Sequence, residues 1–298
     1  MPDNPLAEVF GFPVADMSVE AVNHRRMGLC PFGNSSGPNC TKVSATDPIG
    51  VCSIWDRQRL AVTCPIRMRQ DNLFLSDAAD FFFPGQHCLA LTEVRLNDGH
   101  NRSAGNIDVV LAMVDENQRV LDFGAIEVQT VYISGNVSAA FRTYMQDPAS
   151  NFAMQWPSKN YPSPDYLSSS RKRLAPQLMF KGGILDAWQK KMAVVVHQAF
   201  FDQLPPMESV DVADAEIAWL VYDFETEKTS GRYRLFRSDV RYTKFASALS
   251  AITVPTVGSM SQFVRSLEDR IKRKKFQGSP EPTPLAPTVE PLAIILGL

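Results

Sequence analysis

The chain has 298 residues, 45% of them hydrophobic, and a formal net charge of −2 at pH 7. This length allows a buried core in one large domain or two modest ones, and the near-neutral charge excludes a generally polybasic, histone-like protein. The sequence contains no apolar run of the roughly 18 residues that a membrane helix needs and no secretion signal at its start, so we expect a cytoplasmic protein without a membrane partner.

The first part of the chain, residues 1–70, is rich in Gly, Pro, Asn and Cys, which break its apolar stretches into short pieces. Four of the five cysteines fall here: Cys30, Cys40, Cys52 and Cys64. A reducing cytosol disfavours disulfides, whereas four thiolates can surround Zn²⁺ or a single iron tetrahedrally. We therefore predict a metal-binding segment packed on the core, with Cys88 as a separate core thiol. Because the spacing lacks a tight C-x-x-C pair, two alternatives stay open: unrelated reduced thiols, or His24 or His87 as a substitute ligand.

The middle of the chain contains the predicted elements that matter most for chemistry. The pattern favours a helix over Asp71–Val94, interrupted at Pro84, and an exposed loop over Asn97–Gly105. Two β-rich runs follow, at Ile107–Val114 and Val120–Ile133, and five polar residues separate them. Such runs with a short polar connection are typical of a β-hairpin.

This hairpin brings two carboxylates together. With the turn centred between Asn117 and Gln118, the antiparallel register places Asp108 opposite Glu127. Directly opposed like charges destabilise a sheet, and a bound divalent cation is the simplest reason to keep them. Gln129 lies two residues beyond Glu127 and therefore on the same face of the strand.

The chemistry of these side chains suits phosphodiester cleavage. Hard oxygen ligands hold Mg²⁺, and the metal stabilises charge on phosphorus and lowers the pKa of a bound water. Gln129 cannot act as a base, but it can orient the attacking water or contact the phosphate. Glu93, at the end of the predicted helix, is a candidate third acid, with an ordinary surface Glu as the alternative. For the hairpin, the alternative is that Asp108 only begins a strand and Glu127 is exposed on an edge strand.

The second half of the chain continues with mixed elements. Asp147–Ser170 is rich in Pro and Ser and is predicted to be a long functional loop, because structureless connections of this length are uncommon. The apolar spacing of Ile184–Leu204 favours a mostly buried helix. We also predict strands at Ile217–Phe224 and Arg232–Val240 and an amphipathic helix at Met260–Phe276. The prolines after Gly278 argue against a packed structure, so residues 278–298 are expected to form a disordered tail.

Basic and hydroxyl side chains form two candidate surfaces for an anionic partner. Hydroxyls can bind phosphates, and guanidinium groups can read guanine in the major groove. The candidates next to the long loop are Ser169, Arg171, Lys172 and Arg173, and those just after Cys64 are Arg67 and Arg69. The alternative for each of them is a solvated surface position.

Several short motifs resemble one family. They are Glu8–Pro13, Cys30–Phe32, Asn39–Lys42, Asp47–Ser53, Thr63–Pro65 and Glu127–Thr130. Together they resemble the NotI and EagI group of type II restriction endonucleases, over roughly residues 8–245. The Gln at position 129, where most PD-(D/E)xK nucleases have Lys, departs from the wider superfamily and fits this group.

The resemblance implies an α/β fold with a central mixed sheet flanked by helices. It also implies a homodimer that cuts both strands of double-stranded DNA at a GC-rich palindrome with Mg²⁺, leaving 5′-phosphate ends, and a cognate DNA methyltransferase as a separate protein. Carried over by position, Asp108, Glu127 and Gln129 are the catalytic set. The four cysteines of residues 1–70 are then ligands of a structural iron or zinc ion.

The domain organisation expected on this basis has three parts. Residues 1–70 form the metal-binding segment, residues 71–277 the catalytic and DNA-binding domain, and residues 278–298 the tail. Two other functions stay open at this point. One is a repair or recombination nuclease with the same hairpin, and the other is a non-catalytic DNA-binding protein with a structural metal finger.

Overall fold

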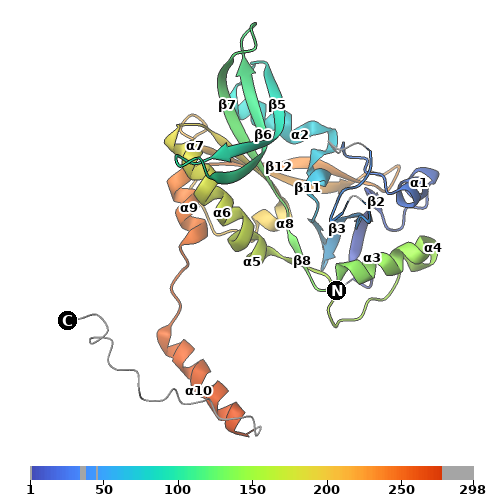
Figure 1. The fold of residues 1–298 in the computed structure, drawn as a ribbon. Coiled ribbons are helices and arrows are strands. Elements are labelled where there is room, and N and C mark those ends of the chain that lie inside the picture. Colours follow the sequence, from blue (N-terminus) through green and yellow to red (C-terminus); the bar gives the residue numbers. More distant parts are fainter. Residues whose placement is uncertain (1, 34–37, 45, 277–298) are drawn as a thin grey trace. The chain divides into compact units, whose positions relative to one another are not determined.

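The computed structural model describes residues 2–33, 38–44 and 46–276, and Figure 1 shows its fold. The chain divides into two compact units, Met1–Val254 and Pro255–Leu298. In the second unit, the predicted helix is present as α10 (Met260–Phe276). The predicted tail over 278–298 lies outside the described residues. None of the helices in the described ranges is both long and apolar enough to cross a membrane.

A small antiparallel sheet is built from the first part of the chain. Its strands are β1 (Leu6–Val9), β2 (Phe12–Pro13), β3 (Val51–Asp56) and β4 (Arg59–Val62), in the order β2-β1-β3-β4. Helix α1 (Val19–Met27) follows β2, and the hydroxyl of Ser18 caps it by accepting a hydrogen bond from the N–H of Ala21 at 3.3 Å. The helix ends at Gly28, whose φ of 63° is left-handed and suits glycine.

The larger sheet has six strands in the order β12-β11-β10-β7-β6-β5. Its strands are β5 (Cys88–Asn97), β6 (Ser103–Val114), β7 (Val120–Gln129), β10 (Met192–His197), β11 (Ile217–Thr226) and β12 (Tyr233–Thr243). The central strand β10 is parallel to both neighbours, and the other pairs are antiparallel. The prediction of a central mixed sheet is therefore confirmed.

Helices cover both faces of this sheet. Successive residues of β7 point to opposite faces, and each packs against a different helical layer. Ile126 packs in the same cluster as Phe74 of α2 (Leu73–Phe82). Its neighbour Ala125 packs instead with Leu174 and Leu178 of a long helical segment. That segment consists of α5 (Tyr166–Ser169), the π-helical turn η2 (Ser170–Leu174), α6 (Ala175–Gln177), the π-helical turn η3 (Leu178–Gly182) and α7 (Gly183–Ala187). Helix α9 (Phe245–Thr253) packs against it.

Shorter elements connect the layers. They are η1 (Pro65–Asn72), β8 (Tyr132–Ser134), α3 (Val137–Gln146), α4 (Pro148–Asn151), β9 (Ser163–Asp165) and α8 (Gln198–Phe201). The region predicted as a long loop, Asp147–Ser170, thus contains α4, β9 and α5, and β9 pairs with β8. The prediction of a structureless connection there was wrong.

Of two further predicted helices, one was wrong and the other was confirmed only in its first part. Ile184–Leu204 contains the end of α7, then strand β10 and helix α8. A parallel strand buried on both faces is a continuous apolar run, and β10 is buried along its whole length, so its pattern could not be told from that of a buried helix. The helix predicted over Asp71–Val94 ends at Phe82, and strand β5 begins at Cys88.

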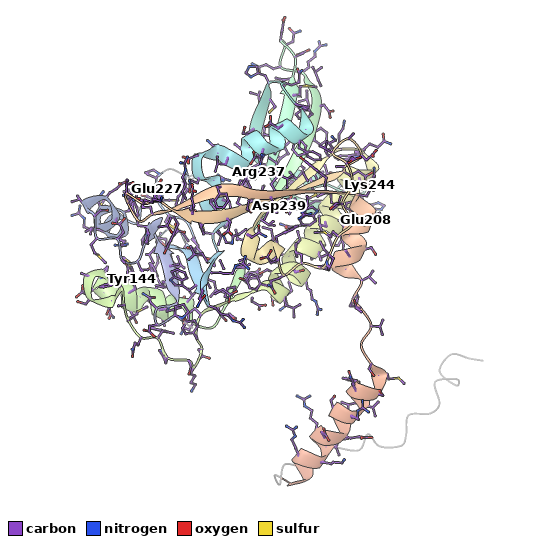
Figure 2. All side chains as sticks on the ribbon, turned by 180° about the vertical axis from the view of Figure 1, so that it is seen from behind. Tyr144, Glu208, Glu227, Arg237, Asp239 and Lys244 are labelled. Atoms are coloured by element: carbon purple, nitrogen blue, oxygen red, sulfur yellow. The ribbon has the colours of Figure 1, made fainter. Side chains whose placement is uncertain are left out.

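The two outer strands of the larger sheet differ in chemistry. On β5, Leu89 and Leu91 are about half exposed, at 53% and 50%, and the stretch from Cys88 to Thr92 has no charged residue. On β12, Arg237 and Asp239 are among the charged side chains along the outer strand (Figure 2). Charged side chains protect a sheet edge from pairing with another chain, so only one of the two edges has this protection along its length.

Candidate active site

The two carboxylates predicted to pair lie next to each other on β6 and β7. The ladder between these strands ends at the pair Val109–Ile126, and Asp108 and Glu127 are the next residues along the two strands. They are close enough for the charge of Asp108 to raise the pKa of Glu127. Figure 1 shows β5, β6 and β7 side by side at the top of the view. Asp108 is partly buried, and Glu127 is fully buried. The alternative of an exposed Glu127 on an edge strand is wrong, because β10 covers the other side of β7.

A third carboxylate continues this row onto β5. Pairs on either side of Glu93 place it opposite Asp108, so it lies on a strand and not at the helix end that the sequence predicted. The φ of Glu93 is 55°, an unusual value for a strand residue, and its Oε2 accepts a hydrogen bond from the side chain of Asn106 at 3.4 Å. We call Glu93, Asp108 and Glu127 the acid row.

A lysine that the sequence analysis missed enters the acid row from the helical layer. The Nζ of Lys181, in the π-helical turn η3, lies 2.7 Å from each carboxylate oxygen of Glu127. It also donates to the backbone carbonyl of Asn106 at 2.6 Å. Lys181 is 5% exposed. Its signal in the sequence was a lone charge among apolar neighbours in the stretch Leu178–Leu185, which is the pattern of a buried and therefore paired lysine.

Two carboxylates of the acid row, Asp108 and Glu127, have raised pKa values although Lys181 is present. The pKa of Glu127 is raised to about 8, chiefly by burial and also by the charge of Asp108, while Lys181 acts in the opposite direction. Burial also raises the pKa of Asp108, although its Oδ2 accepts a hydrogen bond from the N–H of Val128 at 2.7 Å. Carboxylates with raised pKa values next to each other are the environment in which a divalent cation is stabilising.

The donor set of the acid row fits a hard cation. Carboxylate oxygens are the ligands that Mg²⁺ prefers, and the ammonium group of Lys181 already stands where positive charge is needed. In the part of the chain that the structure describes, no three His, Cys, Asp or Glu side chains are arranged as ligands of one metal ion. Within the acid row, both oxygens of Glu127 are occupied by Lys181.

Gln129 lies two residues after Glu127 and is 2% exposed. Its Nε2 donates a hydrogen bond to the backbone carbonyl of Thr130 at 2.7 Å. The amide nitrogen is therefore used next to its own backbone and is not directed to the acid row in this structure.

The four cysteines of residues 1–70 line a single cavity of about 650 Å³. The pKa of the Cys30 thiol is raised to about 11, chiefly by burial and also by the proximity of Cys64 and Cys40. Because none of the described groups of His, Cys, Asp and Glu has the arrangement of a metal centre, the predicted four-cysteine centre is not confirmed. Lys42 lies in the same cavity and donates to the hydroxyl of Thr63 at 2.8 Å.

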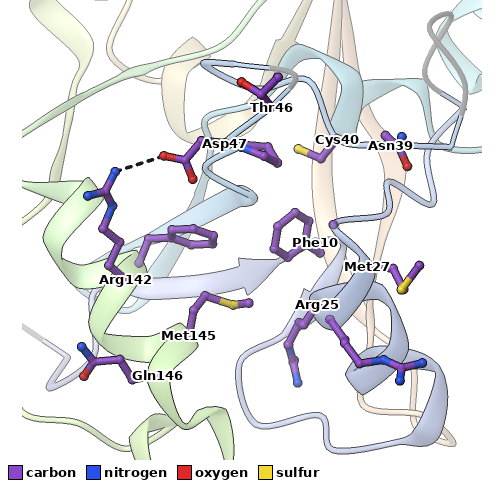
Figure 3. Close-up of a pocket in the computed structure, with 14 residues that line it drawn as sticks. Phe10, Arg25, Met27, Asn39, Cys40, Thr46, Asp47, Arg142, Met145 and Gln146 are labelled. Carbon is purple, nitrogen blue, oxygen red and sulfur yellow. Dashed lines mark hydrogen bonds and ion pairs between the residues drawn. The ribbon is translucent and has the colours of Figure 1, made fainter.

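A second cavity, of about 590 Å³, shares Phe10 and Cys40 with the first. Figure 3 shows Arg142 reaching from α3 to Asp47, with which it forms an ion pair at 3.1 Å. Both partners of this pair are largely exposed, so it adds little to stability. The ring of Phe10, which lines both cavities, lies near the centre of this view.

Two of the candidate DNA contacts are buried and form contacts within the protein. Arg67 is fully buried, and its Nε donates to the Glu8 carboxylate at 3.0 Å. Its guanidinium also lies over the rings of Phe32 and Phe224, 4.3 and 4.7 Å from their centroids. The Ser169 hydroxyl is buried as well and donates to the carbonyl of Asp165 at 2.7 Å. Neither side chain offers a surface to DNA in this structure.

The remaining basic candidates lie at the surface. Arg171, Lys172 and Arg173 are exposed on the π-helical turn η2, and Arg69 is partly exposed in η1. Arg173 lies over the ring of Tyr132, 4.7 Å from its centroid, and its charge acts to lower the pKa of Asp108. One helical segment thus carries an exposed basic turn near the acid row and, further along, the buried Lys181.

Comparison with known proteins was made for the whole chain. A family model described as "Restriction endonuclease NotI" matches residues 14–235. The matched range contains the acid row, Lys181 and all five cysteines, and it spans well over half of the chain. No curated protein matches the sequence.

Proposed function

Because the chain belongs to the NotI family of restriction endonucleases, and is therefore a type II site-specific deoxyribonuclease, we propose that Asp108 and Glu127 hold the Mg²⁺ used for cutting DNA. The observation that carries this proposal is the proximity of the two carboxylates at the end of the β6–β7 ladder, together with the buried ammonium group of Lys181 on Glu127. The family match also argues against a repair nuclease and against a non-catalytic DNA-binding protein.

When bound, Mg²⁺ would stabilise the developing charge on the phosphate and lower the pKa of a bound water. The residues of the chain prepare the site. The N–H of Val128 fixes the Asp108 carboxylate, and Glu93 adds a third carboxylate next to it. Gln129 cannot accept a proton as a base, so its proposed role is to orient the attacking water through its amide.

The basic turn of η2 is proposed to contact DNA. Arg171, Lys172 and Arg173 are exposed, and Arg173 is close enough to the acid row to affect Asp108. Arg69 is a weaker member of this set because it lies on a different element. Phosphate contacts from such residues would place the scissile bond over the acids.

Finer features of the proposal come from the family. They are a homodimer, a GC-rich palindromic target, 5′-phosphate ends and a separate cognate DNA methyltransferase. The described residues of one chain form one acid row, and cutting both strands of a palindrome requires two, which supports a second copy. The division into residues 1–70 and residues 71–277 also stays a proposal.

We further propose that Cys30, Cys40, Cys52 and Cys64 hold a structural iron or zinc ion. The four thiols share one cavity, and this is the support for the proposal. The same cavity is lined by Arg173 and Tyr132. A metal ion there would hold the first part of the chain against the basic turn and would take no part in cleavage.

Digestion of a plasmid of known sequence tests the function. We expect Mg²⁺-dependent cutting into discrete fragments, and sequencing of their ends gives the target and the cut position. Asp108→Asn should lower the single-turnover cleavage rate by on the order of 10³-fold, since a metal ligand contributes several kcal/mol to the barrier. Glu116→Ala, which removes an exposed carboxylate at the turn of the same hairpin, is the matched control and should cut normally. Random nicking, or undiminished cutting by Asp108→Asn, would contradict the proposal.

A further inference from the structure

Lys181 occupies the oxygens that the metal site needs. Its ammonium group lies 2.7 Å from both Glu127 oxygens, and the third donor reaches the Asn106 carbonyl at 2.6 Å. The pair is almost fully buried, with side-chain exposures of 7% for the lysine and 1% for the glutamate. A divalent cation that binds Glu127 must therefore share these oxygens with the ammonium group or displace it, and the two like charges repel each other.

The lysine has little freedom to leave once it is displaced. Its stem passes close to Gly105, where an added Cβ would lie 3.5 Å from Lys181 Cε. The turn η3 that carries it is anchored by Leu178, which is fully buried in the core. A buried ammonium without an acceptor is strongly destabilising, so the displaced group needs a new anionic partner close by.

DNA supplies such a partner. A phosphate bound at the acid row presents non-bridging oxygens, which accept charge-assisted hydrogen bonds from an ammonium group. Gln129 carries no charge, and its Nε2 is directed to the Thr130 carbonyl, so it does not supply a charge-assisted contact in this structure. Lys181 is the described side chain that combines a positive charge with direct contact to Glu127.

We propose that Lys181 neutralises the acid row until the divalent cation arrives, and then binds the phosphate of the DNA as a catalytic residue. This inference rests on the proposed function. The same charge therefore has two opposite effects. It competes with the metal for Glu127 in the free enzyme, and it stabilises negative charge on the phosphate during cleavage.

Replacing the lysine by an uncharged side chain of similar length separates these two effects. Lys181→Met should bind Mg²⁺ about tenfold more tightly in the absence of DNA, because a competing positive charge is gone. The same variant should cleave on the order of 10²-fold more slowly in a single turnover at saturating Mg²⁺. Isothermal titration calorimetry with Mg²⁺ alone measures the first effect, and quenched cleavage of a target duplex measures the second.

Lys190→Met is the matched control. Lys190 lies between α7 and β10, is partly exposed and pairs with Asp122 of β7 at 2.7 Å, so its loss should change neither quantity. Lys181→Arg keeps the positive charge and should retain the wild-type Mg²⁺ affinity and cut faster than Lys181→Met. If Lys181→Met does not fold, the comparison of Lys181→Arg with wild type still decides, because a shift in its Mg²⁺ affinity as large as tenfold would contradict the proposal.

Weaker or unchanged Mg²⁺ binding by folded Lys181→Met would overturn the inference, and so would an unchanged cleavage rate. Failure of the underlying function has a different signature. If Asp108→Asn, with Lys181 retained, binds Mg²⁺ as tightly as the wild-type protein, the acid row is not the metal site. This conclusion does not depend on the results for the Lys181 variants.

Discussion

At the scale of single residues, Glu127 is the most informative position. It is fully buried, yet it faces a second carboxylate across the ladder and a lysine from another layer. The position of Glu127 relative to Asp108 could be predicted from sequence, because a hairpin register depends only on local pattern and turn length. The contact with Lys181 could not, since the two residues are 54 positions apart and meet only through the packing of the helical layer on the sheet.

The raised pKa of Glu127 predicts how stability depends on pH. Its folded pKa of about 8 is above the usual value of 4.5, so the folded protein binds this proton more tightly than the unfolded chain. The corresponding stability is fully present below about pH 4.5 and is lost as pH rises through about 8. For the metal-free protein, we therefore expect the free energy of unfolding to fall between these pH values, as measured by urea denaturation. Glu127→Gln should reduce that slope, and an unchanged slope in this variant would assign the proton to another group.

The exposed arginines make a different kind of prediction. Arg171→Gln removes one charge from the basic turn without disturbing the interior, because Arg171 is exposed. We expect weaker DNA binding. The slope of log Kd against log salt concentration should decrease by about one, which corresponds to the loss of one phosphate contact. Fluorescence anisotropy with a duplex at several salt concentrations measures this. An identical salt slope for variant and wild type would remove Arg171 from the DNA contacts.

At the scale of elements, the strands in which apolar and polar residues alternate could be predicted from the sequence. The strand that is buried along its whole length could not. The β6–β7 hairpin and the strands β11 and β12 were predicted correctly, with ends shifted by a few residues. Strand β10 was taken for a helix because both of its faces are buried, which removes the period of two from its sequence. Strand β5 was missed because it follows α2 after only a short turn, and the predicted helix was continued beyond the interruption at Pro84.

The contact of α2 with β7 depends on one small residue. A Cβ added to Gly124 would lie 2.5 Å from the ring of Phe82, so the phenylalanine would have to move. We expect Gly124→Ala to lower the free energy of unfolding by about 2 kcal/mol, as is typical of overpacking in a core. Gly183→Ala in α7 is the control, because an added Cβ there meets no atom within 4 Å. Equal stability of the two variants in urea denaturation would show that Phe82 adapts without cost.

The cavity lined by the four cysteines of residues 1–70 leads to a prediction about bound metal. Metal analysis of the purified protein should find about one iron or zinc ion per chain that survives removal of Mg²⁺. Cys40→Ser should lose this metal and lower the thermal midpoint, because metal binding stabilises the folded segment. Cys88→Ser is the matched control, since Cys88 lies on β5 and does not line this cavity. Full metal content in Cys40→Ser would exclude Cys40 from the ligands.

At the scale of the whole molecule, a buried ion pair ties the small sheet to the large one. Arg67 contacts Glu8 of β1, the ring of Phe224 of β11 and the carbonyl of Tyr233 of β12 within the unit Met1–Val254. Breaking a buried pair leaves an uncompensated charge, which is more costly than the pair itself is stabilising. Sequence analysis assigned Arg67 to DNA because nothing local distinguishes a buried arginine from an exposed one.

The proposed homodimer is tested on the full chain. Sedimentation equilibrium at micromolar concentration without DNA should give twice the mass of the chain. The same measurement with a target duplex should give the mass of two chains and one duplex. A monomer that cuts both strands at equal rates in a single binding event would contradict the need for two acid rows.

The unequal edges of the larger sheet limit how copies can associate through backbone hydrogen bonds. If the uncharged stretch of β5, from Cys88 to Thr92, pairs with the same stretch of another copy, a two-fold axis relates the copies, and the assembly closes at two. Addition of β5 to β12 would instead repeat without end, but the charges along β12 oppose it. Filament growth by sheet extension is thus blocked on one side, and the protein can be concentrated without building open-ended stacks through this sheet.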